Sequence, residues 1–128
     1  MGNFLLDTGL IIRHLRGQQQ AVQLLRSLAK TGRLGIASIT RLEIHAGMHP
    51  DERFATSKLL SRFLMYELDK ATADHAGELI YQARAQQVSL TVPDAIIAAT
   101  AVHHNLTLIT LNQTDFKTIP GLRIHSLE

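Results

Sequence analysis

Five short apolar runs, separated by stretches with helical spacing, constrain the fold of this chain more than any other feature. None of them alternates cleanly between apolar and polar residues, which is typical of strands in a parallel sheet covered on both faces. We therefore predict strands at these positions. The runs are 4–6, 34–37, 63–68, 107–111 and 122–124.

Helical patterns fill the intervals between the predicted strands. Residues 19–29 place apolar side chains on one face, as do residues 57–63 and 72–87. Strands that alternate with helices form right-handed βαβ units. We therefore predict an α/β fold, a three-layer α/β/α sandwich around a parallel sheet of about five strands. A length of 128 residues suits a single domain over residues 1–128.

The helix that begins at Val92-Pro93-Asp94 is apolar on all sides. Such a helix is buried all round. It is therefore either central to the domain or covered on one face by another subunit, so we expect a homodimer.

Composition restricts the protein class. Apolar residues make up 45% and charged residues 19%, which is typical of a globular protein, and a net charge of +2 does not announce a nucleic-acid binder. The chain has no cysteine, which excludes disulfides and thiolate metal sites. The start lacks the pattern of a signal peptide, and the longest apolar run, 95–102, is too short to span a membrane. We expect a soluble, cytoplasmic protein without a membrane partner.

Four acidic residues stand at the ends of predicted strands or at the starts of helices: Asp7, Glu43, Asp94 and Asp115. Each has an ordinary structural explanation. Asp7 suits an N-cap of a helix over 10–15, and Thr40 with Glu43 has the spacing of a capping box. Asp94 follows a proline at the first helical position, where a helix favours negative charge, and Asp115 suits a turn or cap.

Taken together, the four acids favour a second interpretation. Ligands of open α/β sheets bind beyond the carboxyl ends of the strands, where these acids should gather. Clustered carboxylates repel each other and raise each other's pKa unless a cation lies among them. Mg²⁺ or Mn²⁺ is the natural candidate, and such ions activate water for phosphodiester hydrolysis.

Four segments carry a resemblance that covers nearly the whole chain. They are LLDTG (5–9), ASITRLEIHAG (37–47), VPDAIIAATA (92–101) and LTLITLNQTDF (106–116). By these segments the chain resembles the PIN-domain family, in particular the VapC-type toxin ribonucleases.

The resemblance implies a role for each matching residue. Asp7, Glu43 and Asp94 match the core acids of the family's metal site, and Asp115 matches its more variable fourth acid. Thr8, Thr110 and Asn112 match polar residues that support the site. The family fold is a parallel sheet of order 3-2-1-4-5. The family activity is Mg²⁺- or Mn²⁺-dependent cleavage of RNA, often tRNA or rRNA, and a cognate VapB-type antitoxin inhibits it.

One position departs from the family pattern, and three arginines have two possible roles. Gly9 stands where the family typically has Asn, so the loop of the site is expected to be less preorganised. Arg13 and Arg16 share a helix face, and Arg84 lies on a later helix. All three either hold an RNA phosphate or simply belong to a solvated face.

Other functions are disfavoured by the sequence. The leading alternative is a non-catalytic PIN-like module whose acids only cap helices. A phospho-acceptor receiver domain normally needs paired acids after its first strand, where Asp7 stands alone. His45 and His49 have the spacing of zinc ligands but lack the glutamate directly after the first histidine.

Overall fold

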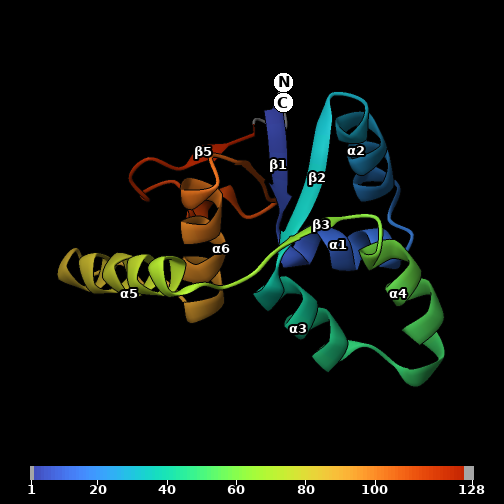
Figure 1. Ribbon diagram of the computed structural model, residues 1–128, viewed down its shortest axis with the longest axis horizontal. Helices are drawn as coiled ribbons and strands as arrows, with labels where there is room; N and C mark the ends of the chain where they lie inside the picture. Colours follow the sequence, from blue (N-terminus) through green and yellow to red (C-terminus); the bar gives the residue numbers. More distant parts are fainter. Residues whose placement is uncertain (1, 126–128) are drawn as a thin grey trace.

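The computed structural model describes residues 2–125, with a parallel sheet at its centre (Figure 1). The strands follow the order β3-β2-β1-β4-β5, and all four neighbouring pairs run parallel. This confirms the predicted fold class and strand order. The strands are β1 (Gly2–Leu6), β2 (Gly32–Ala37), β3 (Leu64–Tyr66), β4 (Thr107–Ile109) and β5 (Arg123–Ile124).

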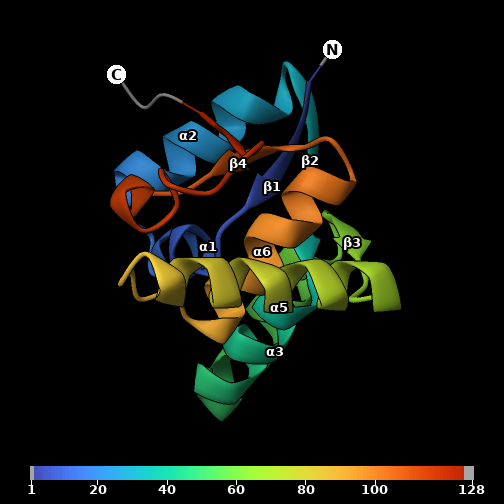
Figure 2. The ribbon, with the colours of Figure 1, turned by 90° about the vertical axis from the view of Figure 1, so that its left-hand side faces the viewer.

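Helices cover both faces of the sheet because successive strand side chains point to opposite faces. Leu5 of β1 packs into a core with α5 and α6, whereas Leu6 packs into a second core with α1, α2 and α4. Figure 2 shows α5 and α6 in front of the sheet and α1 and α2 behind it. The helices are α1 (Thr8–Leu15), α2 (Gln19–Ala29), α3 (Ser38–Gly47), α4 (Arg53–Leu60), α5 (Lys70–Ala85) and α6 (Val92–His103), with short 3-10 turns at η1 (Pro50–Glu52) and η2 (Gln113–Asp115).

Helix α6 is covered within one chain. Every residue from 95 to 101 is buried, and α5 packs along it on the side away from the sheet. The idea that a bare face of this helix meets a second subunit is therefore wrong, because α5 already covers it. Neither α6 nor any other helix of residues 2–125 is both long and apolar enough to cross a bilayer.

Element boundaries shifted where tertiary contacts decide them. The strand expected at 63–68 is only Leu64–Tyr66, because β2 ends at Ala37 and leaves β3 no further partner. The backbone N–H of Leu68 donates instead to Ser38 Oγ at 3.2 Å. The helix expected at 57–63 is α4, which begins earlier, directly after η1, whereas α2 has the predicted bounds 19–29.

Candidate active site

Asp7 lies at the carboxyl end of the central strand. Its backbone N–H donates to Ile109 O of β4, and it is also the N-cap of α1. The side chain is only 7% exposed, and both oxygens accept hydrogen bonds: Oδ1 from Thr8 N at 2.8 Å and Oδ2 from Thr110 Oγ1 at 2.7 Å. Asp7 therefore caps a helix and is also fixed in orientation.

Burial makes ionisation of Asp7 unfavourable. Desolvation raises the pKa of Asp7 above its ordinary value of 3.8, and the hydrogen bonds from Thr110 and Thr8 lower the pKa in part. The charge of Asp115 raises the pKa further. A carboxylate held this way at a strand end is typical of a functional site.

Glu43 reaches toward Asp7 from α3. The carboxylate is half-buried, and its Oε1 accepts a hydrogen bond of 2.8 Å from Thr8 Oγ1. The capping-box interpretation of Thr40 and Glu43 is wrong, because α3 begins at Ser38 with Ala37 as its N-cap. Thr8 therefore connects two acids, donating its backbone N–H to Asp7 and its hydroxyl to Glu43.

Asp94 comes to the same edge at the start of α6. It is the third helical residue, not the second, because the N-cap is Thr91, whose Oγ1 accepts from Asp94 N at 3.3 Å. Burial is the largest cause of the raised pKa of Asp94, and the charge of Asp7 is the next. A hydrogen bond between Thr91 and the side chain of Asp94 lowers this pKa, while the charges of Asp115 and then Glu43 raise it.

Asp115 and Asn112 lie on the surface beside these acids. Asp115 ends η2 and is exposed, yet its charge acts on both Asp7 and Asp94. Asn112 is exposed as well, and its backbone N–H donates to Thr110 Oγ1 at 3.0 Å. The Thr110 hydroxyl thus orients Asp7 through one hydrogen bond, and the Asn112 backbone orients Thr110 through another.

The four acids form an electrostatic unit that suits a hard cation. Every charge that shifts the pKa of Asp7 or Asp94 comes from another carboxylate. The donors are all oxygen atoms, the ligands that Mg²⁺ and Mn²⁺ prefer. Within residues 2–125, however, no three acidic or histidine side chains stand close enough together to hold one ion as they are placed. The donor chemistry fits a divalent cation, while the side chains are spread more widely than a bound ion requires.

The three arginines expected at RNA phosphates are all exposed. Arg13 lies in the last turn of α1 and Arg16 at its C-cap, whereas Arg84 lies in the last turn of α5. Arg13 and Arg16 are on the helix that Asp7 begins, two turns beyond that acid.

Sequence reasoning missed Thr40 as part of the site. Its side chain is 0% exposed, and its Oγ1 lies 3.0 Å from Thr8 Oγ1. The only available signal was the spacing of Thr40 and Glu43, which pointed to a helix cap.

Comparison with known proteins follows the same segments. Residues 4–122, which contain all four acids, match the PIN domain. The chain belongs to the PIN-domain family.

Relatives place it in the VapC-type group. Ribonuclease VapC10 of Mycobacterium tuberculosis is 33% identical over 119 residues, which cover 93% of this chain and 90% of that protein. The tRNA(fMet)-specific endonuclease VapC of Salmonella typhimurium is 28% identical over 129 residues, covering 97% of both proteins. The crystal structure of DNA-bound VapBC from Salmonella typhimurium aligns with a TM-score of 0.86 at 26% identity, over 98% of both chains.

Proposed function

We propose that this PIN-domain protein is a metal-dependent endoribonuclease and the toxin of a type II toxin–antitoxin system. Full-length relatives that are named ribonucleases support RNA cleavage. The observation that carries the proposal is the gathering of carboxylates at one edge of the sheet: the charge of Asp115 raises the pKa of Asp7, the charges of Asp7, Asp115 and Glu43 raise the pKa of Asp94, and no basic group among residues 2–125 acts on either pKa.

Each acid has a part in the proposed chemistry. Asp7, Glu43, Asp94 and Asp115 would hold Mg²⁺ or Mn²⁺, which supplies a Lewis acid and lowers the pKa of a bound water. Thr8 and Thr110 orient Asp7 through both of its oxygens, and Thr8 also orients Glu43.

Substrate binding needs positive charge outside the acidic edge. Arg13 and Arg16, which follow Asp7 on α1, and Arg84 on α5 bind phosphates of the RNA, with tRNA or rRNA as the substrate class. Because all three are exposed, each is free to contact the polyanion.

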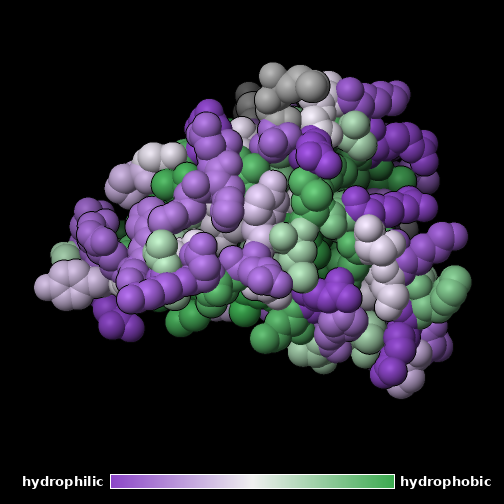
Figure 3. Space-filling view, in the orientation of Figure 1, coloured by the Kyte–Doolittle hydropathy of each residue, from purple (hydrophilic) through white to green (hydrophobic). Residues whose placement is uncertain are grey.

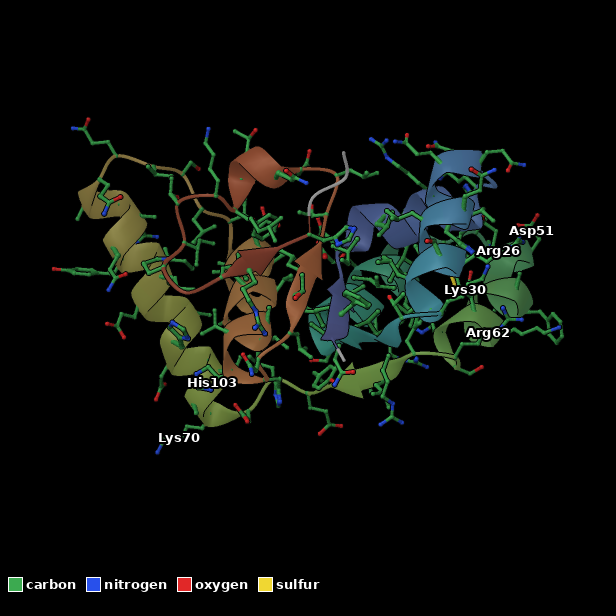
Figure 4. All side chains as sticks on the ribbon, turned by 90° about the horizontal axis from the view of Figure 1, so that it is seen from above. Arg26, Lys30, Asp51, Arg62, Lys70 and His103 are labelled. Atoms are coloured by element: carbon green, nitrogen blue, oxygen red, sulfur yellow. The ribbon has the colours of Figure 1, made fainter. Side chains whose placement is uncertain are left out.

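A cognate antitoxin of the VapB type is the proposed partner, docking in a groove between α1, α2 and α4. The pocket there measures ≈ 400 Å³ and has apolar walls that include Leu25, Leu34 and Phe63. Arg26 and Arg62 also line it, and Figure 4 shows them on the same side of the molecule.

A polar atom without a hydrogen-bond partner in residues 2–125 also lines the groove. His14 Nδ1 is buried without a hydrogen-bond partner, and burial followed by the charges of Arg62 and Arg26 lowers the pKa of His14. Residues 1–62 hold nine of the 13 basic residues but only four of the 11 acids. Charge complementarity therefore favours an antitoxin segment that is apolar on one face and carries a carboxylate toward the arginines.

A homodimer is proposed through the edge strand. Leu64 and Met65 of β3 and Leu68 just after it are 37%, 45% and 42% exposed. Figure 3 shows apolar surface on the face of the molecule where β3 lies. An exposed apolar edge strand is normally covered in a stable protein, and a second copy of this chain is the proposed cover.

The test of the nuclease is cleavage of purified tRNA and rRNA with Mg²⁺ or Mn²⁺, with EDTA, and with the Asp7→Asn variant. The proposal expects cleavage only with metal and the native Asp7. Asp74→Asn is the control, because Asp74 is an exposed acid on α5 that does not act on the pKa of Asp7 or Asp94. Intact RNA under every metal condition would favour a non-catalytic PIN-like module whose acids only cap helices.

The groove is tested by copurification with the protein encoded beside this gene. Charge reversal at Arg26 and Arg62 to Glu should weaken the complex, whereas Lys117→Glu, an exposed position after η2, should not. An unchanged affinity in the double variant would place the antitoxin elsewhere.

A further inference from the structure

The hydroxyl of Thr40 is buried at a position where the proposed mechanism gives it no task. Thr40 lies in the first turn of α3 and is 0% exposed. Its Oγ1 has one hydrogen-bond partner within residues 2–125, Thr8 Oγ1 at 3.0 Å. That partner belongs to the first turn of a different helix, 32 residues earlier in the chain.

The direction of the hydrogen bonds follows from counting protons. Thr8 Oγ1 lies within hydrogen-bond distance of both Thr40 Oγ1, at 3.0 Å, and Glu43 Oε1, at 2.8 Å. Thr8 has one hydroxyl proton, and an ionised carboxylate can only accept. The Thr8 proton therefore points to Glu43, and Thr40 donates its own proton to Thr8. The hydroxyls form a chain from Thr40 through Thr8 to Glu43.

We propose that Thr40 is a positioning residue that sets the carboxylate of Glu43 through Thr8, an inference that rests on the proposed metal-dependent nuclease. By occupying a lone pair of Thr8 Oγ1, the Thr40 hydroxyl keeps the Thr8 side chain in the rotamer that donates to Glu43. Thr8 also donates its backbone N–H to Asp7 Oδ1, so one residue fixes two acids. Without Thr40, the Thr8 hydroxyl is held from one side only, and Glu43 loses its fixed position relative to Asp7.

A role in positioning can be distinguished from a role in packing, because the hydroxyl and the methyl group of Thr40 can be removed one at a time. Thr40→Val keeps the shape and removes the hydroxyl. Thr40→Ser keeps the hydroxyl and removes a buried methyl group. If only the packing of the methyl group mattered, the serine variant would be the weaker one in every measurement. A positioning Thr40 makes the valine variant the weaker one in metal binding.

The first experiment measures Mn²⁺ affinity by calorimetry without RNA, alongside the melting temperature. We expect Thr40→Val to bind Mn²⁺ about 10- to 100-fold more weakly, as is usual for groups that orient metal ligands. Thr40→Ser should bind Mn²⁺ like the native protein but melt about 2 to 6 °C lower. Thr100→Val is the matched control, because Thr100 is equally buried in a helix and its hydroxyl donates only to Ile96 O of its own helix.

A second experiment needs neither metal nor substrate. NMR coupling constants of the Thr8 methyl group report its side-chain rotamer, which should be single in the native protein, Thr40→Ser and Thr100→Val, and averaged in Thr40→Val. An unaveraged Thr8 rotamer in Thr40→Val overturns the proposal, as does native Mn²⁺ affinity in that variant. If the native protein itself neither binds Mn²⁺ nor cleaves RNA, the nuclease proposal fails, and the rotamer measurement still decides the role of Thr40.

Discussion

Asp7 carries a charge where the fold makes charge unfavourable. The side chain is almost fully buried at the end of β1, and the one charge that shifts its pKa is the carboxylate of Asp115 and not a basic group. Two hydrogen bonds offset part of this unfavourable energy. A cation-binding site requires a carboxylate of fixed orientation, and its charge is unfavourable in the metal-free protein.

Replacement of Asp7 by Asn should separate stability from activity. Asn keeps an oxygen for the Thr8 N–H, its amide can donate to Thr110 Oγ1, and the buried charge is gone, so the metal-free protein should melt at a higher temperature. Cleavage of RNA should fall by more than about 100-fold, since even groups that only orient metal ligands contribute about 10- to 100-fold. Thermal unfolding and a cleavage assay with Asp74→Asn as the control measure both effects. A lower melting temperature would show that Asp7 is mainly structural.

The pH dependence of this stability difference has a defined sign. A carboxyl whose folded-state pKa is raised contributes stability that is fully present below its unfolded value of 3.8 and is lost as the pH rises through the folded-state value. The melting temperature of Asp7→Asn minus that of the native protein should therefore increase as the pH rises from about 3.8. Thermal melts of the two metal-free proteins across this range measure it. A difference that shrinks with rising pH would contradict the raised pKa of Asp7.

At the scale of residues, the sequence itself pointed to the acids, whereas the hydroxyls of Thr8 and Thr110 were expected only from the family resemblance. Acids at strand ends are visible in a sequence because burial makes them unusual. Thr40 was not recognised, since its partner Thr8 lies in another helix and its spacing to Glu43 matched a helix cap. No local pattern distinguishes a threonine that faces a helix end from one that faces a second hydroxyl.

Among the elements, the edge strand β3 depends on a glycine in its neighbour. A Cβ on Gly35 of β2 would lie 2.5 Å from Tyr66 Cε2 and 3.2 Å from Leu64 O. The ring of Tyr66 also packs on His104, at a centroid distance of 4.7 Å. The close approach of β3 to β2 therefore leaves no room for a side chain at position 35.

Two glycine substitutions should have opposite effects on stability. Gly35→Ala should lower the free energy of unfolding by about 1 to 3 kcal/mol because it overpacks the contact with Tyr66. Gly77→Ala should raise it by about 0.5 to 1 kcal/mol, because Gly77 lies in α5 with open space around it. Urea unfolding of both variants measures the difference. Equal free energies of unfolding for the two variants would mean that β3 does not pack closely on β2.

Sequence patterns predict the bounds of interior elements better than the bounds of edge strands. Residues 19–29 were predicted with correct bounds because the apolar face of α2 is set by its own periodicity. The end of β3 at Tyr66 depends on where β2 turns into α3, because its partner Ala37 lies 29 residues earlier in the chain. The burial of α6 was predicted correctly, but what covers it is α5 and not another subunit.

At the scale of the whole molecule, the apolar residues around β3 should bring two copies together. Met65→Glu should convert a dimer into a monomer, because a charge at this edge strand repels a second copy. Phe54→Glu should leave the dimer intact, since Phe54 is 80% exposed on α4 and is not part of this patch. Sedimentation analysis of the three proteins provides the measurement. A native protein that sediments as a monomer would contradict the proposed dimer.

The strand order came from family resemblance rather than from periodicity, because strand patterns alone do not say which strands are neighbours. The order matters for function, since it puts β2 and β4 on either side of β1. Segments that carry Asp7, Glu43 and Asp115 then leave the same edge of the sheet, and α6 brings Asp94 to it.

The most direct test of the whole account is Mn²⁺ binding to the RNA-free protein, measured by calorimetry for the native chain and for Asp7→Asn, Glu43→Gln, Asp94→Asn and Asp115→Asn. The account predicts that the native protein binds Mn²⁺ and that each substitution weakens binding, least for the exposed Asp115. Binding that none of the four substitutions changes, or no binding at all by the native protein, would contradict a shared cation site.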